Sequence, residues 1–379
     1  MHWYFFVSLK QLFFLTVSVL GLCVFQQGKA DSLQTVFASK LSTEYDSNPS
    51  LSPGASGSWV AYFQPAVTVT KVFGTDKIIA GVNLLMQDSS NLAVSSDSVN
   101  PAALLNWLHS GENRTLDLKS SYIQTSTRYS GIDSVGRTSS PSSTRDLSEI
   151  TGDWIEQSGQ RSNVELNGLY DKATYQDSSY NNYELTSASL KFSYEIYESS
   201  VLFGKLSRSN LTLPLGVAIS LPQTFNEEAV GIEWTGEKTL WKTQLAEAQD
   251  NLGNSTPEAL MDFKYTGQFS ESKLATGQML VASGMGGFVK ADQVKFNSGY
   301  ALSEYIKVGL DYSFIKNLIP QSIGYTSQSS LGWWFENEVS ATWKCRTYYA
   351  NLQNKGEGVT VVFNNVIGLS LSYSGLSLF

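Results

Sequence analysis

Long hydrophobic segments are absent from the chain once its first thirty residues are set aside. A helix that crosses a membrane needs about 20 consecutive apolar residues. The apolar run from Leu12 to Phe25 has only 14 residues and lies near the N-terminus. This length is typical of a signal peptide. The absence of any other long run excludes a membrane protein built from helices.

Residues 1–30 carry two lysines and no acidic residue, and they end in Gly28-Lys29-Ala30. Small residues at the first and third of these positions are what a signal peptidase recognises. We therefore predict a cleaved signal peptide at 1–30 and a single domain at 31–379. An uncleaved anchor is less favoured because no stop-transfer charges follow. A lipoprotein is disfavoured because Leu22 precedes Cys23, where a small residue is required.

Basic charge and cysteine are scarce in the rest of the chain. Without the signal peptide it has 24 lysines and arginines against 34 acidic residues, a net charge of −10. This balance excludes nucleic acid as a partner, because phosphate binding needs a basic surface. Cys345 stays alone after Cys23 is removed, so no intramolecular disulfide can form.

Patterns for catalysis and cofactor binding are also absent. His109 is the single histidine after the signal peptide, and we expect it as a solvated side chain in a loop beside Ser110. Serine-histidine catalysis would also need an orienting acid or amide. No spacing of histidine or cysteine suits a metal, and Gly284–Gly287 lacks the lysine of a phosphate-binding loop. We expect no enzyme activity, no metal and no cofactor.

Alternation of apolar and polar residues is what the sequence does contain. In 259–270 one face holds Met261, Phe263, Tyr265 and Phe269, while the other holds Asp262, Lys264, Thr266, Gln268 and Ser270. Residues 187–196 and 306–313 repeat this period of two. Such stretches exceed the 5 or 6 residues of an ordinary strand and resemble strands with one face in lipid and one in water.

The alternation predicts an all-β transmembrane barrel of antiparallel up-and-down strands, about 14 in number, with 12 or 16 as alternatives. The predicted strands are 33–46, 58–72, 77–87, 114–130, 161–176, 183–198, 200–212, 227–237, 239–250, 259–270, 273–284, 287–297, 299–314, 331–349 and 359–379.

The predicted connections differ in length. Residues 236–238 and 270–272 are expected as tight turns, whereas long polar loops are expected near 88–113 and 131–160, on the extracellular side. Within the first loop, Pro101–Leu108 is interpreted as a short helix, either folded into the lumen as a constriction or lying on the surface. Residues 138–144 are expected to be a loop tip without function.

The last residues resemble the closing-strand signal that the barrel-assembly machinery recognises. Ile367, Leu369, Leu371, Tyr373 and Gly375 share one face of the final strand, and the chain ends at Phe379. The resemblance implies assembly into a bacterial outer membrane, with Tyr373, Gly375 and Phe379 as assembly residues. Ser377 departs from the pattern.

The first predicted strand ends in Glu44-Tyr45-Asp46-Ser47-Asn48-Pro49-Ser50-Leu51. This segment resembles the "tyrosine, Asp-Asn-Pro, leucine" pattern of the beta-barrel porins associated with exopolysaccharide and exosortase (PEP-CTERM) systems. In this chain Ser47 stands where that family usually has Asp or Asn. The resemblance implies export or surface display of a polysaccharide or related envelope polymer.

Strand parity places charged residues on the predicted inner face. The candidate lumen and selectivity residues are Asp117, Lys119, Lys191, Glu195, Asp262, Lys264, Lys307, Asp311, Glu338 and Arg346. Charges of both signs can create a transverse field that selects solutes, or can pair across strands and close the interior. Cys345 has the parity of the lipid-facing side and is interpreted as a small apolar residue.

Three functional hypotheses follow. The leading one is an outer-membrane barrel that acts as a passive pore or an export-associated channel. Its expected partners are the lipid bilayer and the barrel-assembly machinery, with polysaccharide or export-system components as further candidates. The second is a structural or adhesive barrel with a plugged lumen, whose loops at 88–113 and 131–160 bind a partner. The third is a soluble secreted β-protein, which the strand length and Phe379 disfavour.

Overall fold

The computed structural model describes residues 32–49, 54, 56–126, 144–176, 180–214, 223–251, 253–283, 287–319, 324–356 and 361–375. The predicted signal peptide at 1–30, the loop tip at 138–143 and Phe379 lie outside these residues. In the described part, no helix is long and apolar enough to span a membrane.

The described chain folds into one sheet of eighteen strands of 12 to 16 residues. The strands are β1 (Ser32–Asp46), β2 (Ser58–Phe73), β3 (Asp76–Ser89), β4 (Ser98–Ser110), β5 (Arg114–Ser126), β6 (Thr144–Gln157), β7 (Ser162–Tyr175), β8 (Tyr183–Tyr197), β9 (Ser200–Thr212), β10 (Thr224–Thr235), β11 (Thr239–Asp250), β12 (Ser255–Thr266), β13 (Ser270–Ser283), β14 (Gly287–Ala301), β15 (Ile306–Ile319), β16 (Gly324–Glu338), β17 (Trp343–Gly356) and β18 (Val362–Ser374).

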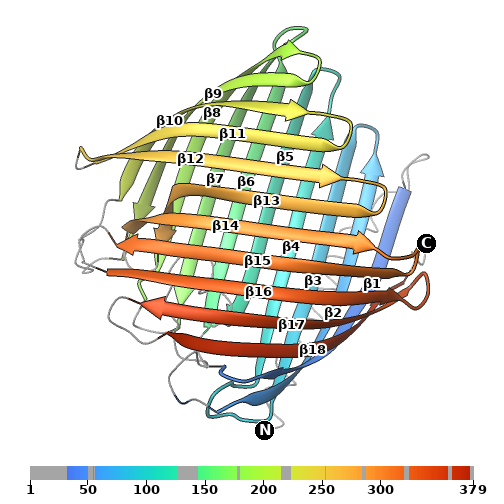
Figure 1. Ribbon diagram of the computed structural model, residues 1–379. Helices are drawn as coiled ribbons and strands as arrows, with labels where there is room; N and C mark the ends of the chain where they lie inside the picture. Colours follow the sequence, from blue (N-terminus) through green and yellow to red (C-terminus); the bar gives the residue numbers. More distant parts are fainter. Residues whose placement is uncertain are drawn as a thin grey trace.

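The sheet closes on itself as a barrel (Figure 1). Each strand is antiparallel to the next one in the sequence, and β1 pairs with both β2 and β18. No strand is therefore left as an edge with unpaired backbone groups, which is the condition for a sheet to exist in lipid. The predicted class, an antiparallel up-and-down barrel, is confirmed.

The predicted number of about 14 strands is wrong, and three segments account for the difference. Strand β4 occupies half of the predicted loop 88–113, so the helix expected at 101–108 is part of a strand. Strand β6 occupies half of the predicted loop 131–160. The predicted strand 331–349 is divided between β16 and β17, which are joined by residues 339–342.

The two ends of the barrel differ in their connections. At one end, called the short-turn end, eight connections have two to four residues, and β1 begins and β18 ends there. The opposite end, called the long-loop end, carries the longer connections, such as 47–57 and 90–97. The predicted turn at 236–238 is confirmed, while the turn expected at 270–272 lies at 267–269.

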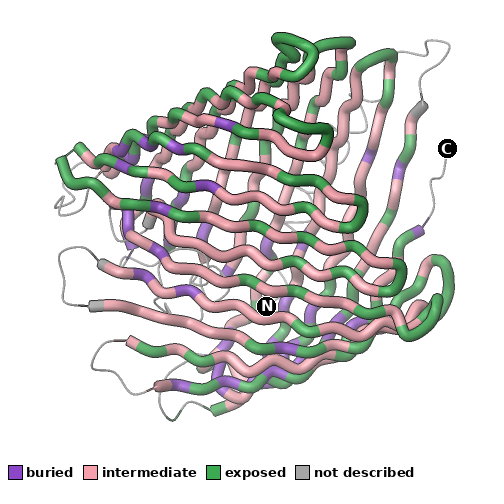
Figure 2. Tube along the Cα trace, turned by 45° about the horizontal axis from the view of Figure 1, so that its top comes forward, coloured by how far each residue is buried: buried purple, intermediate pink, exposed green. Residues whose placement is uncertain are grey.

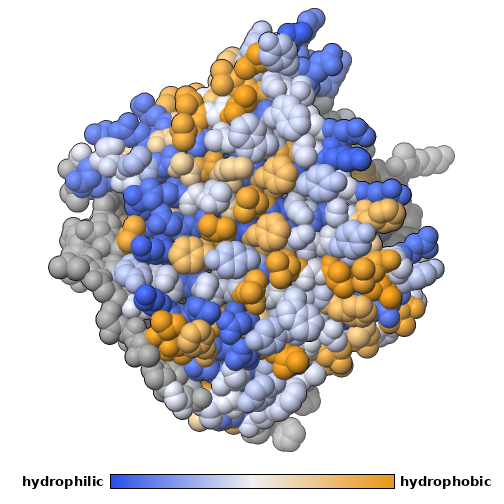
Figure 3. Space-filling view, viewed as in Figure 1, coloured by the Kyte–Doolittle hydropathy of each residue, from blue (hydrophilic) through white to orange (hydrophobic). Residues whose placement is uncertain are grey.

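The outer surface carries an apolar belt between more polar ends. Figure 3 shows apolar and weakly polar side chains over the middle of β10–β18, with strongly hydrophilic ones gathered toward the edges. Exposed examples are Leu190, Phe192, Leu206, Val230, Leu245, Leu331, Ile367 and Leu369. Aromatic contacts occur near the strand ends, as between Tyr45 and Trp59 and between Trp343 and Tyr373. These are the lipid-facing band and aromatic girdle of a transmembrane barrel.

Candidate functional site

The inner face of the wall is identified by side-chain contacts that skip a strand, because such contacts occur only on the concave side. Lys191 of β8 lies 3.2 Å from Glu233 of β10. Tyr348 of β17 donates a hydrogen bond of 2.7 Å to Glu44 of β1. Alternation along each strand then assigns the remaining residues to the lumen or to the lipid side.

The register places all ten candidate lumen residues on this inner face. They are Asp117, Lys119, Lys191, Glu195, Asp262, Lys264, Lys307, Asp311, Glu338 and Arg346. Their proposed effect on solute passage stays a prediction. Cys345 faces the lipid side, opposite Leu371 on β18 and Asn337 on β16.

Most of the candidate charges are paired across strands. Lys191 lies 3.5 Å from Glu165 and 3.2 Å from Glu233, and Glu233 lies 3.1 Å from Lys242. The partners Glu233 and Lys242 come from β10 and β11. Alternation alone gives their face, but the pairing depends on the relative register of four strands. The sequence analysis therefore did not select them.

Similar groups line the lumen toward the short-turn end. Glu338 lies 2.7 Å from Lys344 and 3.4 Å from Lys307, and Arg346 lies 3.6 Å from Asp311. Two more candidate residues are paired, Lys119 with Glu149 at 4.0 Å and Lys264 with Glu271 at 3.7 Å. Further lumen pairs are Lys205 with Glu227 at 3.4 Å and Lys273 with Glu271 at 3.0 Å. Asp117, Glu195 and Asp262 form no ion pair with a described residue, and Asp117 accepts a hydrogen bond of 2.6 Å from Asn106. Both expected arrangements, pairing across strands and unpaired charge, therefore coexist.

Two lumen cations keep their charge exposed. Lys40 of β1 and Lys295 of β14 are exposed side chains on the inner face, and neither forms an ion pair with a described residue. Both line a hollow of about 520 Å³ together with Asp311, Trp334 and Arg346. The Arg346 guanidinium lies 4.3 Å from the centre of the Trp334 ring. This part of the lumen can therefore hold water and a solute.

A neighbouring arc of the lumen, beyond the closing seam of β18 and β1, is nearly uncharged. Among the described inward residues of β2, β3 and β4, Lys77 is the one charged side chain. Apolar residues such as Leu85, Leu104 and Leu108 alternate with amides and hydroxyls there. Charge on one side and its absence on the other make the lumen laterally asymmetric, which produces a transverse field.

The lumen is narrowed by a hairpin that leaves the wall near the long-loop end. Pairing of β13 with β12 ends at Ala259 and Gln278, whereas β13 stays paired with β14 up to Ser283 and Gly287. The backbone N–H of Leu280 donates a 2.8 Å hydrogen bond to the buried carboxylate of Glu258. We call residues 279–283 and 287–289 the inner hairpin.

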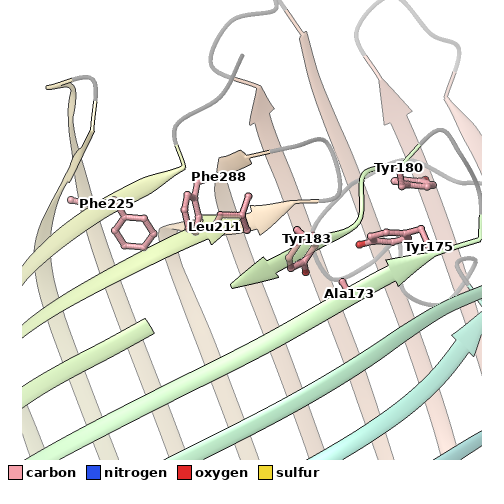
Figure 4. Close-up of a cluster of buried hydrophobic side chains, with 8 residues drawn as sticks. Ala173, Tyr175, Tyr180, Tyr183, Leu211, Phe225 and Phe288 are labelled. Atoms are coloured by element: carbon pink, nitrogen blue, oxygen red, sulfur yellow. The ribbon is translucent and has the colours of Figure 1, made fainter. Parts of the chain in front are cut away.

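The inner hairpin packs against the inner wall several strands away. Phe288 meets Phe225 of β10 edge to face, with ring centres 4.6 Å apart, although three strands lie between β10 and β14. Figure 4 shows this cluster, where Leu211 lies beside Phe288 and Tyr183 lies farther along, toward Tyr175. Buried side chains are concentrated toward this end of the strands (Figure 2). The constriction is thus formed by this hairpin, whereas residues 101–108, expected as a helix either in the lumen or on the surface, belong to strand β4 of the wall.

The segment Glu44–Leu51 has a structural role where it is described. Glu44 accepts hydrogen bonds of 2.7 Å from both Tyr62 and Tyr348, and Asn48 binds Asn364 through its backbone N–H at 2.9 Å. Asp46 is fully buried and accepts a hydrogen bond from the same backbone N–H. These contacts fasten the closing seam between β1, β2 and β18.

Two further sequence predictions concern single residues. His109 lies within β4 and not in a loop, on the outer face at the short-turn end, where its Nδ1 is 3.0 Å from Asp76. Tyr373 is on the lipid side of β18, and the N–H of Gly375 donates to the carbonyl of Phe37. Phe379 lies outside the described residues, so the assembly signal stays a prediction.

Comparison with solved structures gives the same architecture. The chain is similar to OccAB3 of Acinetobacter baumannii, with a TM-score of 0.51 and 9% identity over 91% of this chain and 99% of that one. It is similar to OccK9 (OpdG) of Pseudomonas aeruginosa, with a TM-score of 0.51 and 10% identity over 92% and 99%. The outer membrane protein OpdK of Pseudomonas aeruginosa gives 0.50 and 10% over 90% and 99%.

At these identities the likeness shows a shared fold. No protein-family model matches the chain, and no curated protein matches it. OpdK, one of the proteins that share this fold, is named as an outer membrane protein. The expectation that the chain is not an enzyme stays a prediction, because at these identities the neighbours speak for the fold alone. The resemblance of Glu44–Leu51 to exopolysaccharide-associated porins gains no support from them.

Proposed function

We propose that this chain is a passive outer-membrane channel for small polar solutes. The single observation that carries the proposal is an exposed, charged inner face in a barrel of eighteen strands, represented by Lys40 and Lys295. Barrels of 16 to 18 strands leave room for an aqueous channel. A barrel that served only as a membrane scaffold would have no need of exposed charges in its interior.

The inner hairpin sets the size of the solute. Phe288 of this hairpin packs against the wall. The open pathway for solutes then runs between the nearly uncharged arc of β2–β4 and the charged arc of β14–β17. A transverse field between such arcs orders water and favours solutes that carry a dipole or charge. The solute class is therefore small and polar.

The liposome-swelling rate tests this proposal. Purified protein in liposomes is expected to admit small sugars and amino acids and to exclude large oligosaccharides. Equal swelling rates for all solutes would contradict a channel narrowed by the inner hairpin. The same assay tests polymer export, which the Glu44–Leu51 resemblance implies and which requires passage of long oligosaccharides.

A plugged structural barrel is the second candidate, and the packed cluster around Phe225 and Phe288 is the observation that favours it. In that case liposomes that contain the protein would not swell with any solute. The lipid bilayer and the barrel-assembly machinery are proposed partners of both the open and the plugged barrel. The apolar belt suits the bilayer, and the closing strand with lipid-facing Leu369, Leu371 and Tyr373 suits the assembly machinery.

A further inference from the structure

The outer face of the barrel has an apolar hollow of about 730 Å³ over β5–β10. Its floor is a row of small residues on three neighbouring strands, Gly152, Gly168 and Ala188, which are directly paired in the register. A Cβ placed on Gly168 would meet no heavy atom within 4 Å. The missing side chains therefore leave real space on the lipid side of the wall.

Large apolar side chains border this floor. Trp154, Leu166, Leu190 and Leu206 form the adjacent row on β6 to β9. Leu166 and Leu190 are each 44% exposed, and Leu206 is 56% exposed. Three strand spacings separate the ends of this row, a length of about 14 Å. The hollow is thus an elongated trough whose lining suits a hydrocarbon chain.

The trough ends where the outer face changes from apolar to charged. On β9 the lipid-side residue Leu206 is followed by Arg208, and on β10 Val230 is preceded by Glu228. The same change occurs at Lys172 and Glu184 on β7 and β8. This line marks the headgroup level on the long-loop side of the membrane.

Arg208 differs from Lys172, the cation on the outer face of β7. Lys172 is held 2.8 Å from Glu184, whereas Arg208 forms no ion pair with a described residue and lines the trough. A guanidinium binds a phosphate through two parallel hydrogen bonds. The unpaired guanidinium at the headgroup level is complementary to a lipid phosphate, and the apolar trough beside it is complementary to an acyl chain of the same lipid.

We propose that the trough binds one acyl chain of a phosphate-bearing lipid from the leaflet on the long-loop side, with Arg208 holding the phosphate. The acyl chain covers the apolar floor that the small side chains leave open. The lipid phosphate neutralises the Arg208 guanidinium at the headgroup level. The inference rests on the membrane-spanning barrel but not on conduction, so it stands or fails independently of the pore.

Native mass spectrometry of the detergent-purified full chain tests the trough, with lipid A, a phosphorylated acylated disaccharide, as the probe. One lipid A is expected to stay bound to the wild type. Gly168→Leu is expected to abolish this binding because its side chain fills the trough. Thr347→Leu, at a lipid-side position on β17 opposite Phe335, is the matched control and should bind as the wild type does.

The charge is tested separately. Arg208→Gln is expected to weaken lipid A binding about fivefold, the effect of one cation near a membrane surface. Lys172→Gln, at the same level but paired with Glu184, should leave the affinity unchanged. Heat-dependent electrophoretic mobility establishes that each variant is folded, and Ala188→Phe replaces Gly168→Leu if that variant does not assemble.

Two results would overturn the proposal. One is equal binding of lipid A by the wild type, Gly168→Leu and Ala188→Phe. The other is a wild type that binds no lipid A but forms dimers or trimers that Gly168→Leu abolishes, which would make the trough an interface between copies. Channel conductance of Gly168→Leu is expected at the wild-type level, so loss of lipid binding and loss of the pore are distinguishable.

Discussion

Lys40 and Lys295 are exposed lumen cations without an ion-pair partner in the described residues, in contrast to Lys191 and Lys307. A paired charge is largely neutralised for a passing ion, whereas an unpaired one raises the local concentration of anions. The acidic excess of the whole sequence points toward cations. The ion preference of the lumen therefore depends on these single positions more than on net charge.

Reversal of both charges is the corresponding prediction. Lys40→Glu together with Lys295→Glu is expected to lower the chloride-to-potassium permeability ratio by roughly a factor of two to ten. The reversal potential in a KCl gradient measures this ratio. Lys172→Glu, on the outer face, is the control and should leave the potential unchanged. An unchanged potential in the double variant would remove these two lysines from the ion pathway.

Glu44 gives a prediction about stability. Its carboxylate accepts hydrogen bonds from Tyr62 and Tyr348 across the closing seam, and it is buried. Glu44→Ala leaves two hydroxyl groups without this acceptor and is expected to cost about 2–4 kcal/mol of unfolding free energy.

The measurement for Glu44→Ala is the urea concentration at which the heat-modifiable band disappears. Glu228→Ala, an exposed residue of the outer face on β10, should unfold with the wild type. If the two variants unfold at the same urea concentration, the tyrosine contacts do not stabilise the seam.

Single-residue faces could be predicted from the sequence, while contacts between distant strands could not. Period-two alternation places Lys191 and Glu195 inward, and Cys345 outward, without knowledge of the fold. The pairing of Lys191 with Glu233 depends on the stagger between β8, β9 and β10, which no local pattern encodes. The sequence therefore predicts which side of the wall a residue occupies, but not its partner.

At the scale of elements, strands with contrasting faces were predictable and strands with similar faces were not. Strand β4 has Leu105 and Trp107 on the lipid side but also Leu104 and Leu108 on the lumen side, so its sequence lacks alternation and resembles a helix. Strand β6 has polar residues on both faces and resembles a loop. Burial of apolar side chains on the uncharged arc is a tertiary effect that overrides the local pattern.

The inner hairpin supplies the prediction at this scale. Replacement of residues 280–288 by a short Gly-Asn turn removes Phe288 and Leu280 from the cluster, while the pairing of β12 with β13 up to Gln278 is retained. Single-channel conductance is expected to increase, roughly doubling, because the obstruction leaves the lumen.

Phe225→Ala is a milder test of the same contact. It removes one ring of the edge-to-face pair with Phe288, and it should increase open-channel noise and keep the barrel intact. Unchanged conductance in the hairpin replacement would show that residues 280–288 do not limit the pathway. Loss of the heat-dependent mobility shift would instead identify the hairpin as part of the assembled wall.

For the whole molecule, the class was predictable from the sequence but its size was not. Alternation and the absence of long apolar runs predict a closed antiparallel barrel, and the last residues resemble the closing strand of one. The count of eighteen depends on β4, on β6 and on the division of 331–349, where local signals are weak. The difference between 14 and eighteen strands matters because a wider barrel leaves more room for water beside the inner hairpin and the packed cluster.

The current through a planar lipid bilayer that contains the purified full chain tests the central claim most directly. We predict stepwise, steady single-channel currents in KCl, smaller than those of the hairpin replacement measured under the same conditions. A protein that is folded by the heat-modifiability criterion, yet gives no steps in either form, would contradict a channel and favour a plugged structural barrel.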